Sequence, residues 1–167
     1  MNIITKAVAI SAILLTAACS ENGGMFGGGG GGNDINGING GPIDETSLAY
    51  FQQTIGDTVR FQVDQSTLTP EAITILNAQA SWLNANPAAR VLIEGHADEQ
   101  GTRDYNTALG GRRANAVSAY LVSQGVADNR ISIISYGKER PLAICSTESC
   151  WSQNRRAVTI VTSGAGV

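Results

Sequence analysis

The residues of this chain that could do chemistry concentrate between Gly95 and Arg113. The stretch begins as GHADEQGTRDYN, one residue after the apolar run Val91–Ile93, which has the composition of a buried strand. Ligands of open α/β sheets favour the crevice beyond the carboxyl ends of the strands, where Asp98 would lie. Arg113 would follow two turns into the next helix. The helical face that carries Arg113 also carries, at steps of three and four residues, Asn106, Leu109 and Val117.

An acidic and a basic side chain across one cleft suit a zwitterionic ligand. The carboxylate of Asp98 would accept an ammonium group, and the planar guanidinium of Arg113 would hold a carboxylate through two parallel hydrogen bonds. A plain salt bridge between the two side chains accounts for the same pattern. The sequence therefore predicts either a site for an amino acid head group or a structural ion pair, and the spacing leaves both open.

Metal-dependent and nucleophilic catalysis have little support in the sequence. His96 is the one histidine of the chain, and a catalytic zinc site takes three protein ligands and an open position. No activated-serine motif is present. We therefore expect His96 to pack or to form hydrogen bonds at the strand end. We expect no enzymatic activity, no metal and no cofactor.

The elements that must position this stretch alternate along the chain. Apolar periodicity and capping residues predict strands at 58–61, 91–93, 131–134 and 157–161, and helices at 69–84 and 104–124. Segment 137–156 is expected to be a long loop. Alternating strands and helices favour parallel neighbours, and the last strand, which no helix precedes, should add antiparallel. The expected fold is α/β in class, an α+β sandwich with a mixed four-stranded sheet and helices on one face.

The first nineteen residues are typical of a bacterial lipoprotein. Lys6 precedes an apolar run of 12 residues, Ala7–Ala18, which is shorter than the roughly 20 residues that span a bilayer. A charged start, a short apolar core and small residues before Cys19 fit a secretory signal peptide. We expect cleavage before Cys19 and lipid on its sulfur. Ordinary signal cleavage, which would leave a free thiol, is the alternative.

Composition divides the chain into three parts. Residues 1–18 form the expected signal peptide, 19–46 the lipidated N-terminus with a Gly/Asn-rich flexible linker, and 47–167 one folded domain. After removal of residues 1–18, ten basic and fourteen acidic residues leave a net charge of −4. A mildly acidic chain of this kind argues against nucleic acid as a partner.

Cys145 and Cys150 remain as an even pair once Cys19 is acylated. In an exported protein such a pair favours a disulfide, and two free thiols are the alternative.

The polar stretch belongs to a longer motif. Segment 95–121 reads GHADEQGTRDYN-x-x-LG-x-RRA-x-x-V-x-x-YL, which closely resembles the OmpA-like peptidoglycan-binding domain. Segments 61–64, 135–137 and 154–157 match further parts of that family in the same order. The resemblance covers essentially the whole folded domain and implies a βαβαββ arrangement.

The resemblance also implies a ligand and the residues that hold it. Asp98 and Arg113 match family positions that bind diaminopimelate, the diamino acid of peptidoglycan stem peptides, whose amino acid head is a zwitterion. Three further matching residues would line the cleft: Asp64, Asn106 and Leu109. The motif Asn154–Arg156 would support the cleft rather than touch the ligand. Two departures from the family are Ala97, where threonine is common, and Gly111, which costs the helix about 1 kcal/mol relative to alanine.

With lipid on Cys19, the resemblance implies an outer-membrane lipoprotein on the periplasmic face that holds peptidoglycan without a covalent bond. It further implies a place in the Tol system of the envelope, which serves envelope integrity and cell division, with TolB and other Tol proteins as partners. An OmpA-like lipoprotein outside the Tol system is one alternative. A periplasmic hydrolase that acts on stem peptides in the same cleft is another.

Overall fold

The computed structural model describes residues 44–163. The expected signal peptide, the expected lipidation site at Cys19 and nearly all of the expected linker lie outside these residues. Within the part of the chain that is described, no helix is both long and apolar enough to cross a membrane.

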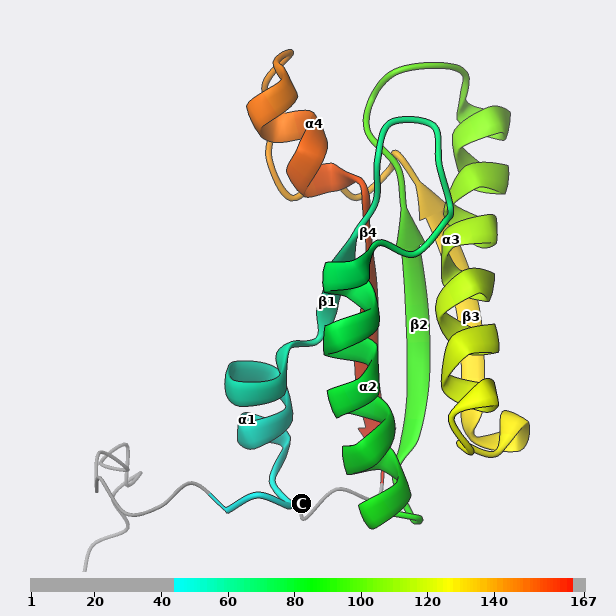
Figure 1. Ribbon diagram of the computed structural model, residues 1–167. Coiled ribbons are helices and arrows are strands. Elements are labelled where there is room, and N and C mark those ends of the chain that lie inside the picture. The colour runs from blue at the N-terminus through cyan, green and yellow to red at the C-terminus, as the bar shows by residue number, and fades with distance from the viewer. Residues whose placement is uncertain (1–43, 164–167) are drawn as a thin grey trace, which may run out of the picture. The chain divides into compact units, whose positions relative to one another are not determined.

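A short helical segment opens the described chain, and strands and helices then alternate (Figure 1). The elements are α1 (Leu48–Tyr50), the π-helical turn η1 (Phe51–Gly56), β1 (Thr58–Arg60), α2 (Pro70–Ala85), β2 (Arg90–His96), α3 (Arg103–Ser123), the 3-10 turn η2 (Asp128–Arg130), β3 (Ile131–Gly137), α4 (Glu148–Asn154) and β4 (Arg156–Ser163). The predicted order of four strands and two long helices is confirmed.

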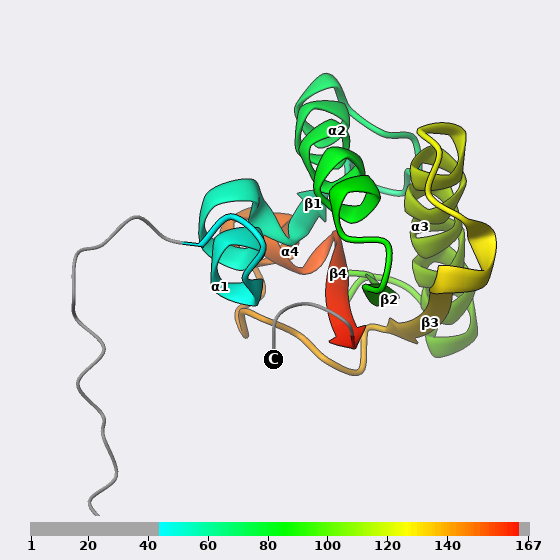
Figure 2. The ribbon, with the colours of Figure 1, turned by 90° about the horizontal axis from the view of Figure 1, so that it is seen from below.

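The four strands form one mixed sheet in the order β1-β4-β2-β3. β2 pairs parallel with β3, whereas β4 pairs antiparallel with both β1 and β2. The last strand therefore joins antiparallel, as expected, and it does so in the middle of the sheet. α2 and α3 lie on the same face of this sheet (Figure 2). The predicted fold class, a mixed four-stranded sheet with helices on one face, is confirmed.

Both long helices begin at a threonine whose hydroxyl satisfies a backbone N–H. Thr69 Oγ1 accepts a hydrogen bond from Ala72 N at 3.2 Å, and Thr102 Oγ1 accepts one from Tyr105 N at 3.3 Å. α3 stops before Gly125, whose φ of +94° is a left-handed conformation that favours glycine. The cap at Thr102 therefore starts α3 directly after the polar stretch that the sequence singles out.

The core lies between the sheet and the two long helices. Its fully buried side chains include Leu76 and Leu83 of α2, Ile93 of β2, and Val117 and Leu121 of α3. Removal of this apolar surface from water is the main force that holds the helices against the sheet.

Two glycines let α3 approach β2 at backbone distance. A Cβ atom at Gly95 would collide with the carbonyl oxygen of Gly110, and one at Gly110 would collide with the hydroxyl of Ser135. Gly111 is different, because a Cβ atom there would meet only the Cβ atom of Ser135, at 3.9 Å. Gly110 therefore serves packing, and nothing in the structure explains Gly111.

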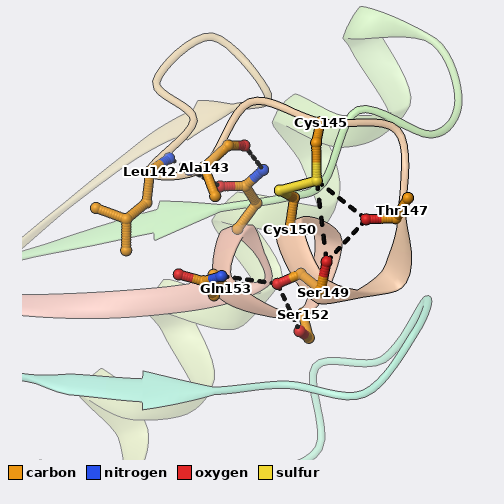
Figure 3. Close-up of a disulfide and its surroundings, with 9 residues drawn as sticks. Leu142, Ala143, Cys145, Thr147, Ser149, Cys150, Ser152 and Gln153 are labelled. Atoms are coloured by element: carbon orange, nitrogen blue, oxygen red, sulfur yellow. Dashed lines mark hydrogen bonds between the residues drawn. A yellow bond between two sulfur atoms is a disulfide. The ribbon is translucent and has the colours of Figure 1, made fainter.

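The segment expected to be one long loop, 137–156, contains the helix α4, so that expectation is wrong for residues 148–154. Seven residues without an apolar stripe carry too little periodicity to predict a helix. Cys145 and Cys150 form a disulfide at the start of α4, with Cα atoms 5.7 Å apart (Figure 3). The predicted disulfide is confirmed.

The side chain of Asn154, the last residue of α4, holds the segment that precedes the disulfide. The side-chain oxygen of Asn154 accepts hydrogen bonds from Leu142 N at 2.8 Å and Ala143 N at 3.0 Å, and its amide nitrogen donates to Ala143 O at 2.8 Å. α4 thus has a covalent tie at one end and a hydrogen-bonded tie at the other. Its position fixes Glu148, which the site uses.

Candidate functional site

Asp98 lies just beyond the end of β2, where the sequence predicts it. Its side chain is almost buried, with 7% of the residue exposed. Oδ1 accepts a hydrogen bond from Gln100 N at 3.2 Å, and Oδ2 lies 3.1 Å from Nη1 of Arg155. A carboxylate held in this way keeps a fixed orientation and carries its charge at low exposure.

Asp98 lines a small cavity of about 260 Å³, which we call the Asp98 pocket. Its lining residues are Val63, Asp64, Asp98, Gln100, Gly101, Tyr105, Asn106 and Leu109. The structure therefore brings together four of the five predicted ligand and cleft residues in one pocket. Arg113, the fifth, does not line it.

Arg113 lies inside the protein, with none of its surface exposed. Its guanidinium donates hydrogen bonds to three backbone oxygens, those of Gln65 at 2.8 Å, His96 at 2.8 Å and Gln62 at 3.1 Å. The group also lies over the ring of Phe61, 5.3 Å from its centroid. Burial lowers the pKa of Arg113 to about 10, so the group stays charged at neutral pH.

Arg155 takes the place beside Asp98 that a plain salt bridge would have given to Arg113. Its side chain is 4% exposed and pairs with two carboxylates, those of Asp98 and Glu148. Nε donates to the carbonyl of Phe61 at 3.3 Å. Burial alone would lower the pKa of Arg155, but the hydrogen bonds to Glu148 and Asp98 outweigh burial and raise it. The hydrogen bond from Arg155 in turn lowers the pKa of Glu148.

Asp64 and Tyr105 close one side of the pocket. The hydroxyl of Tyr105 donates a hydrogen bond to Oδ1 of Asp64, which raises the pKa of the phenol. The φ of Asp64 is +56°, a left-handed conformation that costs a non-glycine residue free energy. The contact with Tyr105 therefore ties segment 62–65 to α3.

Asn106 and Leu109 lie on the buried side of α3, with 1% and 4% of their surfaces exposed. The amide of Asn106 donates to Gln100 O at 2.8 Å, so it fixes the turn that presents Asp98. Leu109 supplies an apolar wall. The two residues shape the pocket, and Asp98 and Asp64 give it charge.

His96 is buried and does not line the Asp98 pocket. It is 1% exposed, and neither ring nitrogen forms a hydrogen bond within residues 44–163, although Nε2 lies 3.5 Å from Oε2 of Glu94. Burial, together with the charges of Arg156 and Arg140, lowers its pKa to about 4. The imidazole is therefore neutral at physiological pH and packs 5.7 Å from the ring of Tyr136, centroid to centroid.

Residues 60–155 match the OmpA family. The chain belongs to that family. A relative named peptidoglycan-associated lipoprotein, from Mesorhizobium japonicum, is 48% identical over 95% of this chain and 92% of its own length. A relative of the same name from Haemophilus influenzae is 40% identical over 95% of this chain and 98% of its own length. The expected membership in the OmpA-like lipoproteins is therefore confirmed.

Solved structures show the same fold. The crystal structure of the peptidoglycan-associated lipoprotein from Burkholderia pseudomallei matches with a TM-score of 0.62 and 38% identity, over 64% of this chain and 90% of that chain. The C-terminal domain of Helicobacter pylori MotB matches with a TM-score of 0.60 at 20% identity, over 64% of this chain and 86% of that chain. At that identity the second likeness speaks for the fold alone.

Three contacts of the site were missed at the level of sequence. The motif around Arg155 was expected to support the cleft, yet its direct pairing with Asp98 spans 57 residues and leaves no local signal. The same holds for Tyr105 with Asp64, 41 residues apart. The third contact is that of Arg155 with Glu148, which lies in the segment predicted to be a loop. A long-range partner of this kind is visible only once the fold brings the elements together.

Proposed function

We propose that this chain binds peptidoglycan without a covalent bond, by seating the amino acid head of diaminopimelate in the Asp98 pocket. The observation that carries the proposal is Asp98 itself, an almost buried carboxylate that lines a cavity of about 260 Å³. Asp64 lines the same cavity, so two carboxylates face the space where an ammonium group would sit. Hydrogen bonds between charged groups of this kind are stronger than hydrogen bonds between neutral groups.

Arg113 would supply the opposite charge. A guanidinium has five N–H donors, and the three carbonyl contacts of Arg113 leave two of them for a ligand carboxylate. Because Arg113 is fully buried, a carboxylate reaches these donors only if segment 62–65 moves. That segment supplies two of the three carbonyls and contains Asp64 in its strained conformation. Ligand binding would thus displace segment 62–65 far enough for a carboxylate to reach the two unused donors.

The protein would act as a tether and not as an enzyme. Lipid on Cys19 would hold the outer membrane, the Gly/Asn-rich linker would set the reach, and the folded domain would hold the wall from the periplasmic face. The names of the relatives support both the lipid and the wall. We further propose that the protein works in the Tol–Pal system, with TolB and other Tol proteins as partners, in envelope integrity and cell division. This last step rests on the family resemblance.

Co-sedimentation with purified peptidoglycan tests the wall-binding proposal. Wild-type protein should pellet with the wall, and Asp98→Asn should stay in the supernatant, because the amide cannot neutralise an ammonium group. Glu99→Gln is the matched control: Glu99 is the next residue, exposed, and not part of the pocket lining, so this variant should pellet as wild type does. Pelleting of Asp98→Asn at the wild-type level would refute the site, and release of soluble fragments would favour a hydrolase.

TolB capture tests the second step. Immobilised full chain should retain TolB, and purified peptidoglycan fragments should compete with it if both use the same face. A chain that binds the wall but never retains TolB would be an OmpA-like lipoprotein outside the Tol system.

A further inference from the structure

A second cavity has about twice the volume of the Asp98 pocket, 520 Å³ against 260 Å³. It lies between β1, the start of α2 and the start of α4. Its charged lining residues are Arg60, Glu71, Glu148 and Arg155, and Phe61 and Gln62 form the wall toward the Asp98 pocket. We call it the Arg60 pocket.

One guanidinium joins the two cavities. Arg155 lines the Arg60 pocket, and its Nη1 lies 3.1 Å from the carboxylate of Asp98, which lines the other. A single backbone segment also connects the two cavities, because residues 61–62 line the Arg60 pocket and residues 63–64 line the Asp98 pocket. A ligand longer than one amino acid head could therefore leave the Asp98 pocket and enter the Arg60 pocket across a single backbone segment.

The Arg60 pocket already contains a carboxylate held by Arg155. Both terminal nitrogens of the guanidinium contact the carboxylate of Glu148, with Nη1 3.2 Å from Oε2 and Nη2 against Oε1. The fork of Arg155 is 4% exposed, whereas Glu148 is 61% exposed. Because the guanidinium is buried and the acid that it holds is exposed, an external carboxylate can reach the pair and exchange with the carboxylate of Glu148.

Arg60 adds a positive charge with no assigned partner. It is exposed, lines the pocket, and forms no ion pair within residues 44–163. Glu71, which lines the same pocket, lies in the first turn of α2, where hydrogen bonds from its own backbone N–H and from Thr69 lower its pKa. Arg60 is therefore free to take an anionic group from a ligand.

We propose that the Arg60 pocket binds the free carboxylate of the residue next to diaminopimelate in the same stem peptide. Arg60 pairs with this carboxylate, and the fork of Arg155 exchanges Glu148 for it. The inference rests on the proposed function, because it needs the diaminopimelate head in the Asp98 pocket. It adds that the protein recognises two neighbouring residues of the peptide and distinguishes a free carboxylate from its amide.

Calorimetric titration of the full chain with three probes tests this. The probes are free diaminopimelate, γ-D-glutamyl-diaminopimelate, and the same dipeptide with its glutamyl α-carboxylate converted to an amide. The acid dipeptide should bind at least about threefold more tightly than the amide, a modest gain because Arg60 is exposed and the pair is partly screened. Arg60→Gln should remove most of this difference, because only Arg155 then remains to hold the carboxylate, and should leave the affinity for free diaminopimelate unchanged.

Arg90→Gln is the matched control. Like Arg60, Arg90 is an exposed arginine at a strand terminus. It is the first residue of β2 and lines neither pocket. That variant should keep the preference for the acid dipeptide. Equal affinities of acid and amide, or a preference that is undiminished in Arg60→Gln, overturn the inference while the Asp98 pocket stands. Failure of free diaminopimelate to bind at all overturns the proposed function, and this inference with it.

Discussion

Nη1 of Arg155 lies 3.1 Å from Oδ2 of Asp98, so the carboxylate proposed to bind the ligand is paired within the protein itself. The same guanidinium also holds Glu148, and its side chain is 4% exposed. Asp98 therefore shares its arginine with a second acid. This sharing leaves Asp98 oriented by Arg155 yet with charge available for an ammonium group.

Arg155→Gln should destabilise the fold strongly. The change leaves Asp98, itself almost buried, without its cation, and breaking a buried pair from one side costs about 3–5 kcal/mol. Urea unfolding would measure the loss. Arg103→Gln is the control, because the ion pair of Arg103 with Glu139 spans 3.4 Å between side chains that are 75% and 48% exposed. Its loss should cost at most about 1 kcal/mol, and similar losses in the two variants would contradict the account of Arg155.

His96 should titrate far below an ordinary histidine. Because it is the one histidine of the chain, its ring signals can be followed by NMR without assignment, and the midpoint should fall at about pH 4. The folded state resists protonation, while the unfolded chain takes up the proton near pH 6.5. The contribution of His96 to stability is therefore complete above pH 6.5 and is lost as the pH falls toward 4. A midpoint near 6.5 would show that the ring is not buried as described.

Gly110→Ala and Gly111→Ala should change stability in opposite directions. A Cβ atom at Gly110 would collide with Ser135 and with the backbone of Gly95, so the first variant should lose about 1–3 kcal/mol. Gly111 has room for a methyl group, and alanine is the better helix former, so the second should gain up to about 1 kcal/mol. Urea unfolding of the pair measures both effects with one substitution type. Loss of stability in Gly111→Ala would mean that this glycine has a packing role.

Reduction of the disulfide should weaken the site as well as the fold. Closing a loop with a sequence separation of 5 contributes about 2 kcal/mol in the chain-entropy model, and the disulfide also fixes the start of α4, which carries Glu148. The double variant Cys145→Ser, Cys150→Ser should therefore unfold at lower urea and bind purified peptidoglycan more weakly. A reducing dithiol should reproduce both losses in wild type and change nothing in the double variant. If the dithiol left wild type unaffected, the disulfide would not support α4.

The general architecture could be predicted from sequence because its signals are local. The start of α2 is marked by Thr69 with Pro70, β2 by the apolar run at 91–93, and the end of α3 by Gly125. The antiparallel pairing of the last strand follows from the lack of a long helix before it. The helix at 148–154 could not be predicted, because it is short and takes its position from the disulfide and from Asn154.

The site was only partly accessible to the same reasoning. Spacing on one helix face placed Asn106 and Leu109 beside Asp98, and the pocket contains all three. The same spacing placed Arg113 on that face but could not show that backbone oxygens already surround its guanidinium. Nor could it show that Arg155, from the far end of the chain, is the cation that touches Asp98. Tertiary contacts of this kind depend on the sheet order.

Competitive release from purified peptidoglycan tests the central claim most directly. The account predicts that free diaminopimelate, which carries ammonium and carboxylate groups together, releases wild-type protein from the wall. Pimelate has the same chain length and both carboxylates but no ammonium group, so Asp98 has nothing to bind and the protein should remain on the wall. Release by pimelate as effective as release by diaminopimelate, or no release by diaminopimelate, would contradict the claim that Asp98 holds the ligand's ammonium.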